Sequence, residues 1–326
     1  MKKIHPMMVV LILVVALTGC MGQDGEDVDT SSPPPDAEIE KGLSLSPRNY
    51  TEEGFSDFFQ RVELSCDYAT WAGDWTELKV PNSAPYVLID LSDTYGYIPI
   101  ILVSTPLDDG EASSGTIMDY INTINDFVES EDIPFISIGV EVNSLYKTHP
   151  QAYSMLVDTF SSAAQSIKEV SPDTNVIVTF QLERMKGLEG GLFGGNSEDG
   201  TPQWDLIDDF SLADIIAFTT YPCLVERDPS DIPVDYYLEI LSHTSKDIAI
   251  VESGWFRTGP EGWESSSEEQ AEFLDILLSS MDAISPRFVV WSFLYDQQVQ
   301  YPFDTMGLLA EDQNTSMVWS TWLEYN

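Results

Sequence analysis

The chain of 326 residues carries 14 Lys and Arg against 55 Asp and Glu, which gives a formal net charge of −41. Nucleic acids are polyanions, so a surface this acidic argues against nucleic acid as a partner. Hydrophobic residues make up 43% of the chain, which excludes a wholly disordered protein and is enough for one large barrel or two ordinary domains.

The first twenty residues have the pattern of a bacterial lipoprotein signal. Two lysines at positions 2 and 3 precede an apolar run over residues 7–17, and the segment LTGC then ends at Cys20. The run is shorter than the roughly 20 residues that span a bilayer. We therefore predict a signal peptide over residues 1–20 and lipidation of Cys20, which would anchor the chain at the extracellular face of the cell membrane. An uncleaved membrane anchor is the alternative.

Residues 21–40 are rich in acids and contain three consecutive prolines, with almost no apolar side chain to bury. We predict a disordered linker here, which holds the domain over residues 41–326 away from the membrane.

Short apolar runs alternate with longer segments of helical period from residue 42 onward. β-Branched residues are abundant in these runs, and their starts lie 25 to 40 residues apart, as expected for strands of a parallel sheet that are covered on both faces. The predicted strands cover residues 42–46, 67–71, 98–104, 135–140, 175–181, 214–219, 247–252 and 287–293.

The intervening segments contain start signals for helices. Pro150 opens one amphipathic helix, and Ser266 with Glu269 forms a capping pair for another. Eight strands, each followed by a helix, predict the α/β class and a single (β/α)8 barrel over residues 41–326. A doubly wound open sheet is the second interpretation. It is disfavoured because no glycine-rich phosphate turn follows the first strand.

In such a barrel the loops after the strands form the functional face. The fourth predicted strand runs into Glu141 and the seventh into Glu252, so two carboxylates face each other across the barrel. Glycoside hydrolysis needs such a pair, because one group protonates the leaving oxygen while the other attacks or activates water. Aromatic residues beside them, including Trp255, provide flat faces for sugar rings.

These positions resemble the clan A glycoside hydrolases, retaining enzymes with acidic residues at the ends of strands 4 and 7. The endo-β-1,4-galactanases look nearest. The resemblance implies that Glu141 is the acid/base and that Glu252, in the segment IVESGW, is the nucleophile. It further implies that Tyr221 hydrogen-bonds the nucleophile and that Trp291 forms the floor of the sugar site. We expect Glu252 to be ionised and Glu141 protonated at rest.

One position departs from the pattern of that clan. Asn usually precedes the strand 4 Glu and holds the sugar 2-hydroxyl, whereas this chain has Val140 there and Asn143 two residues beyond the Glu. Either Asn143 or another group binds that hydroxyl, or the barrel binds carbohydrate without cleaving it. A non-catalytic carbohydrate-binding lipoprotein is therefore the alternative function, and a purely structural surface protein is a third.

Other residues at the strand ends are weaker candidates for sugar contacts. They are Arg48, Trp71, Asp74 and Trp75. Glu183 and Arg184 are expected to form a structural ion pair at the rim. We predict a carbohydrate substrate, a monomeric state, and no cofactor or metal, since no zinc-binding spacing or phosphate loop occurs.

Overall fold

The computed structural model describes residues 39–193 and 200–325. The predicted signal peptide (1–20), its lipidation site Cys20 and residues 21–38 of the predicted linker lie outside the described residues.

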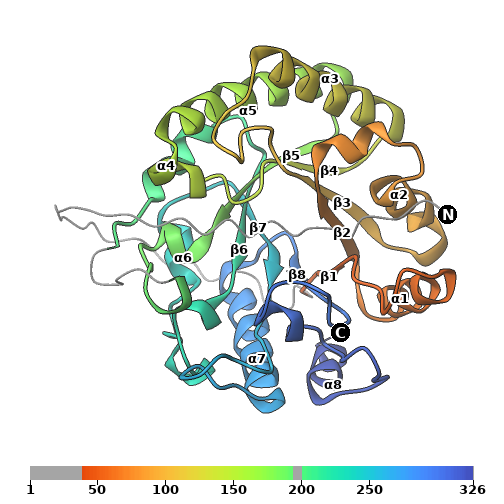
Figure 1. Cartoon of the computed structure of the whole chain (residues 1–326), viewed down its shortest axis with the longest axis vertical. Helices are drawn as coiled ribbons and strands as arrows, with labels where there is room; N and C mark the ends of the chain where they lie inside the picture. The colour runs from red at the N-terminus through yellow and green to blue at the C-terminus, as the bar shows by residue number, and fades with distance from the viewer. Residues whose placement is uncertain (1–38, 194–199, 326) are drawn as a thin grey trace.

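Eight parallel strands close into a barrel within the described part of the chain (Figure 1). Each strand pairs with the next along the chain, and the last pairs with the first. The strands are β1 (Lys41–Ser44), β2 (Tyr68–Gly73), β3 (Ile98–Val103), β4 (Phe135–Ile138), β5 (Asn175–Gln181), β6 (Ile215–Thr220), β7 (Asp247–Ser253) and β8 (Val289–Trp291). The closed barrel confirms the predicted fold class and excludes the open sheet.

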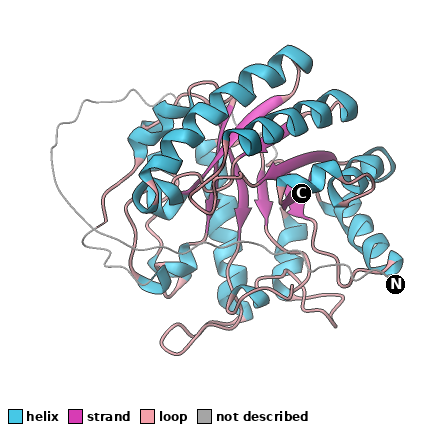
Figure 2. Cartoon of the chain, turned by 45° about the horizontal axis from the view of Figure 1, so that its top comes forward, coloured by secondary structure: helices cyan, strands magenta, loops and turns pink. Residues whose placement is uncertain are grey.

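Helices surround the strands, as Figure 2 shows in cyan around magenta. They are α1 (Glu52–Ser65), α2 (Ala84–Tyr95), α3 (Ser114–Glu131), α4 (Ser144–Thr148), α5 (Pro150–Val170), α6 (Leu182–Met185), α7 (Ser267–Ile284) and α8 (Met317–Glu324). The predicted start signals are confirmed: Pro150 opens α5, and the Ser266 hydroxyl accepts a hydrogen bond from the Glu269 backbone at the start of α7.

The regular alternation weakens between β5 and β7. Among the described residues, β5 is followed by the four-residue α6 and by 3-10 turns, including η2 (Gly191–Phe193) and η4 (Trp204–Phe210). Between β6 and β7 the described elements are 3-10 turns, η5 (Pro222–Leu224), η6 (Pro229–Asp231) and η7 (Leu238–Ser242). The prediction of a helix after every strand is therefore confirmed in a short form after β5 and wrong after β6, where 3-10 turns stand instead.

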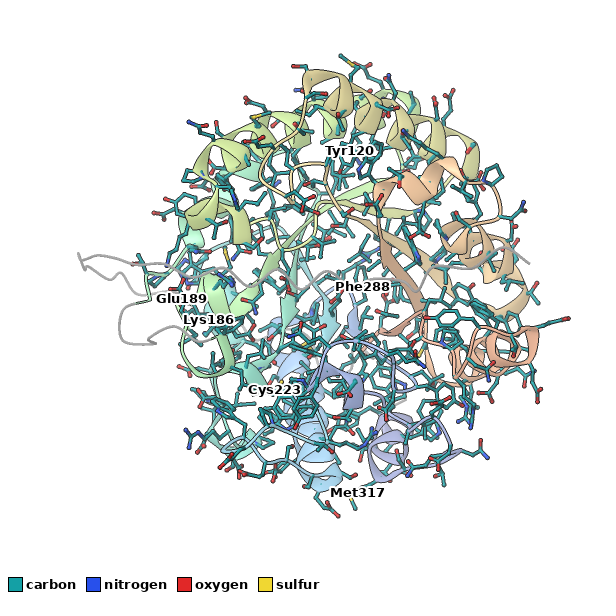
Figure 3. All side chains as sticks on the ribbon, viewed as in Figure 1. Tyr120, Lys186, Glu189, Cys223, Phe288 and Met317 are labelled. Carbon is teal, nitrogen blue, oxygen red and sulfur yellow. The ribbon has the colours of Figure 1, made fainter. Side chains whose placement is uncertain are left out.

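Alternate residues of each strand enter two different cores. Those that face the barrel axis form an inner cluster, which Figure 3 locates by the label on Phe288. Its buried members are Tyr68, Ile100, Leu102, Phe135, Ile177, Ile215, Ala217, Ala249, Val251, Phe288 and Val290. The intervening residues pack outward against the helices in a separate outer cluster. The side chain direction at each strand end follows from this alternation.

Candidate active site

Glu141 stands on an unusual stretch of backbone just after β4. Gly139 has φ +140°, and a Cβ there would lie 2.8 Å from Val142 Cγ1, so only glycine fits. Glu141 itself has φ +51°, a left-handed conformation that costs a non-glycine residue about 1–2 kcal/mol. The Val142 backbone N–H donates to the Thr179 carbonyl on β5 at 3.0 Å and holds this turn in place. Strain of this kind concentrates at functional sites.

Glu252 reaches the mouth of the barrel through an irregularity in β7. Phe218 lies opposite Ile250, but the next residue, Thr219, lies opposite Glu252, so Val251 is an extra residue in β7. Without this shift Glu252 would follow Ile250 onto the outer face. A bulge re-aims the side chains that follow it, and Glu252 thereby shares the inner face with Thr219.

Thr219 lies next to both acidic residues. Its hydroxyl donates to Glu141 Oε1 at 2.7 Å, and its backbone is the register partner of Glu252 on the adjoining strand. Adjacent strands lie about 4.8 Å apart, so the two carboxyl groups occupy one small region of the mouth.

A second hydroxyl network holds Glu252. The Tyr221 hydroxyl donates to Glu252 Oε2 at 2.9 Å and lies 2.8 Å from Ser292 Oγ, at the end of β8. The contact between the tyrosine after strand 6 and the strand 7 carboxylate is therefore confirmed.

The two carboxyl groups titrate as a pair. The pKa of Glu252 is raised to about 7, first by burial and second by the negative charge of Glu141. Burial also raises the pKa of Glu141, against the hydrogen bond from Thr219 and the charge of Arg184. The two groups therefore titrate as a coupled pair in which both pKa values are raised. The expectation that Glu252 is ionised and Glu141 protonated at rest stays a prediction.

Four predicted tryptophans do not reach the mouth. Trp291 is fully buried on the outer face of β8, where its indole N–H donates to the Met306 carbonyl at 3.0 Å. Its neighbour Val290 faces the barrel axis, so Trp291 must face the helices. The three others are Trp71, Trp75 and Trp255, which are 0%, 7% and 0% exposed within the outer cluster. Their predicted sugar contacts are therefore wrong, and their role is packing.

Asn143 is also committed to the protein interior. It is 1% exposed, its amide donates to the Gln181 carbonyl and to Gln203 Oε1, and its oxygen accepts from the Gln181 backbone. Both amide hydrogens are therefore used before any substrate arrives. Asn143 joins the loop after β4 to β5 and does not replace the missing sugar-binding asparagine.

Arg48 and Asp74 lie at strand ends but serve local structure. Arg48 donates to the Tyr295 hydroxyl and to carbonyl groups of Glu311 and Gln313, and it makes no hydrogen bond or ion pair with Glu252 or Asp74 within the described residues. Asp74 is exposed and accepts a hydrogen bond from the Thr76 backbone at 2.8 Å, as a cap of the turn over Trp75–Lys79.

The sequence interpretation missed several residues of this face. Thr219 and Ser292 carry no charge and so gave no signal, although both stand at the ends of strands. Phe303 is half-buried and packs edge-on against the Tyr221 ring at 5.8 Å. The aromatic residues among the exposed large hydrophobic side chains are Tyr50, Tyr146 and Tyr301, and all three follow the carboxyl ends of strands. Their position after a strand, combined with aromatic character, could have identified them.

Residues 39–193 and 200–325 contain no group of three or more His, Cys, Asp or Glu side chains placed to hold a metal ion. The same residues include no helix with the length and apolar character needed to cross a bilayer.

No protein family model matches the sequence, and no curated protein sequence matches it. Solved structures are similar in fold. The exo-β-1,4-mannosidase Op5Man5 from Opitutaceae bacterium strain TAV5 has a TM-score of 0.63 at 15% identity, over 92% of this chain and 62% of the mannosidase. A family 17 β-1,3-glucanosyltransferase from Rhizomucor miehei has a TM-score of 0.58 at 15% identity, with 84% and 94% of the two chains covered. For a psychrophilic family 10 endo-β-1,4-xylanase the TM-score is 0.61 at 10% identity, with 89% and 97% covered.

The chain has the fold of these enzymes. That likeness agrees with the predicted resemblance to clan A barrels. The chain spans about three fifths of the length of the mannosidase.

Proposed function

We propose that this protein is a retaining glycoside hydrolase that acts on a β-linked polysaccharide or oligosaccharide. The observation that carries the proposal is the pair Glu141 and Glu252: the Thr219 hydroxyl bonds Glu141, the Thr219 backbone pairs with Glu252, and the Tyr221 hydroxyl bonds Glu252. The solved structures with this fold include a β-1,4-mannosidase and a β-1,4-xylanase, and this adds support.

Double displacement is the mechanism that we propose. Retaining enzymes place their carboxyl groups about 5 to 5.5 Å apart, whereas inverting enzymes leave room for water at about 6.5 to 9.5 Å. The proposal requires the shorter spacing, and the position of Thr219 beside both Glu141 and Glu252 supports it. Glu252 attacks the anomeric carbon while Glu141 protonates the leaving oxygen. Glu141 then accepts a proton from the water that releases the sugar from Glu252.

Three exposed tyrosines that follow the carboxyl ends of strands support a polymeric or oligomeric substrate. Tyr50, Tyr146 and Tyr301 follow β1, β4 and β8, on which sugar rings beyond the cleavage point can stack. Carbohydrate is therefore the substrate class that we propose.

Val140 favours a second candidate function. It is partly buried against the inner cluster and offers no hydrogen bond where the clan has asparagine. Asn143 does not compensate, as shown above. A barrel that binds carbohydrate without cleaving it is therefore the alternative.

We also propose that the protein is a lipoprotein tethered through Cys20 at the extracellular face of the cell membrane. The basic, apolar and LTGC segments of residues 1–20 support this. Cys20→Ala should move the protein from the membrane fraction to the soluble fraction or leave an unprocessed precursor. An unchanged distribution and mass would contradict lipidation.

The test of function is turnover of a panel of aryl β-glycosides and β-linked polysaccharides, at low and high salt. Glu252→Gln and Glu141→Gln should each abolish turnover in protein that remains folded. Glu129→Gln, on the exposed surface of α3, is the matched control and should retain it. Unchanged turnover in Glu252→Gln would exclude Glu252 as the nucleophile, and with it the proposed site. Sugar binding without release of reducing ends would favour the binding protein. The anomer first formed, followed by NMR, separates retention from inversion.

A further inference from the structure

Arg184 is a buried cation whose guanidinium has no hydrogen-bond or ion-pair partner in the described structure. It is 8% exposed, yet its guanidinium takes part in no hydrogen bond and no ion pair with any residue of 39–193 and 200–325. The guanidinium makes a cation–π contact with the Phe193 ring, with 5.3 Å between Arg184 Cζ and the ring centroid. None of its nitrogens is among the fully enclosed polar atoms that lack a partner, so the guanidinium opens onto accessible space.

Most other cations of the described residues have a carboxylate partner. Seven lysines and arginines lie within 4.0 Å of a carboxylate: Arg48, Arg61, Lys79, Lys147, Lys168, Lys186 and Arg257. Two of these flank Arg184 on the rim, since Lys186 pairs with Glu239 and Lys147 pairs with Glu189. Figure 3 labels Lys186 and Glu189 side by side near α6. In a chain with 55 acidic residues, an unpaired arginine at this place is conspicuous.

The neighbouring acid does not neutralise Arg184. Glu183 is fully buried and was expected to form an ion pair with it. Instead, its carboxylate accepts four hydrogen bonds, from the side chains of Gln181, Thr220 and Tyr236 and from the Tyr221 backbone. With its acceptor sites filled by these donors, Glu183 makes no ion pair with Arg184. The predicted pair is therefore wrong.

Arg184 belongs to the mouth that holds the two carboxyl groups. It follows β5, and its positive charge acts on Glu141, the strand-end carboxylate of the adjoining β4. A guanidinium presents a planar fork of donors that matches a carboxylate. Burying a charge without a partner is costly, and a ligand that supplies the opposite charge removes that cost.

We propose that Arg184 binds the carboxylate of an acidic sugar, so that the substrate contains uronic acid residues. This inference rests on the proposed function, because it assigns a substrate class to the same site.

Binding of a uronate would also prepare the acid for catalysis. In the substrate-free site the charge of Arg184 favours the ionised form of Glu141, whereas the proposed reaction needs Glu141 to carry the proton. A substrate carboxylate on Arg184 offsets that charge, so the protonated form of Glu141 becomes more favourable.

The experiment compares ligands that differ only in a carboxylate. Binding of glucuronic and galacturonic acid is measured against glucose and galactose by calorimetry, and aryl β-uronides are compared with the matching neutral glycosides as substrates. Salt of about 1 M shortens the Debye length to about 3 Å, so that repulsion from the acidic surface does not mask the contact. The variants are Arg184→Gln and Arg184→Lys. Arg287→Gln, an exposed arginine before β8, is the matched control.

We expect the acidic ligands to bind at least tenfold more tightly than the neutral ones. Arg184→Gln should remove this preference, Arg184→Lys should retain part of it, and Arg287→Gln should leave it unchanged. A preference for neutral sugars, or a uronate preference that survives in folded Arg184→Gln, would overturn the inference. Hydrolysis of neutral glycosides alone would contradict the inference about uronates and support the proposed hydrolase. Uronate binding through Arg184 without any turnover would support the inference and contradict the hydrolase.

Discussion

Tyr221→Phe tests the proposed site with the removal of one oxygen atom. That hydroxyl donates to Glu252 Oε2 at 2.9 Å and contacts Ser292 Oγ at 2.8 Å. The donated hydrogen bond stabilises the ionised form of Glu252 and so lowers its pKa, against the larger effects of burial and of Glu141, which together leave it at about 7. Removal of the hydroxyl must therefore raise this pKa further.

The size of the effect follows from the energy of a charged hydrogen bond. Such a bond contributes about 1.5 to 3 kcal/mol, and 1.36 kcal/mol corresponds to one pKa unit. The pKa of Glu252 should thus rise by about 1 to 2 units. At pH 7 the ionised fraction would fall from about one half to about one tenth or one hundredth, a loss of about 5- to 50-fold in kcat/KM. At pH 9 most of that loss should disappear.

The assay is the pH profile of kcat/KM on the best aryl glycoside found, since this profile reports the ionisations of the free enzyme. Tyr97→Phe is the matched control. Its hydroxyl donates to the Leu88 carbonyl at 2.5 Å, and Tyr97 directly precedes β3, at the end of the barrel opposite the mouth. The pH profile of this variant should stay unchanged. If folded Tyr221→Phe kept its acid limb and its activity at pH 7, Glu252 would not be the ionising group that limits the reaction.

Three further substitutions test the surroundings of the site. The pKa of Glu252 is about 7 in the folded protein against an ordinary 4.5, so ionisation of Glu252 destabilises the fold as the pH rises from 4.5 to 7. Glu252→Gln should therefore stabilise the protein against urea at pH 8, by up to about 3 kcal/mol, and should have no such effect at pH 4. Glu183→Gln places an amide where the Tyr221 backbone N–H and the Tyr236 hydroxyl donate hydrogen bonds. We expect kcat to fall with KM unchanged, and the free energy of unfolding to fall by about 1–3 kcal/mol. Activity and stability equal to those of the unchanged protein would contradict a positioning role for Glu183. Trp291→Phe should lower Tm without changing KM, and a raised KM would return Trp291 to the sugar site.

Local sequence determined the barrel and its two carboxylates. Runs such as residues 175–181 are apolar and β-branched, and they recur between amphipathic segments, so the strand positions follow from side chain chemistry alone. The strand β5 has the same bounds as its prediction. Glu141, Tyr221 and Glu252 follow strands directly, and the closed topology puts all strand ends on one face. Their presence in the mouth therefore needed no knowledge of distant contacts.

Tertiary structure decided where the side chains near those ends point. Successive residues of a strand face opposite sides, so a shift of one residue moves a side chain from the mouth to the outer core. Trp291 falls on the outer side for this reason, whereas the extra residue in β7 returns Glu252 to the mouth.

The pairing of charges likewise depended on residues far apart in the chain. Glu183 and Arg184 are adjacent in sequence, but Tyr236 and Thr220 supply the hydrogen bonds that satisfy Glu183. In the same way, the amide of Asn143 donates a hydrogen bond to Gln203, 60 residues away in the chain. Which polar groups remain available to a substrate is set by these long-range contacts, because a buried donor or acceptor is satisfied by whichever partner the fold brings to it.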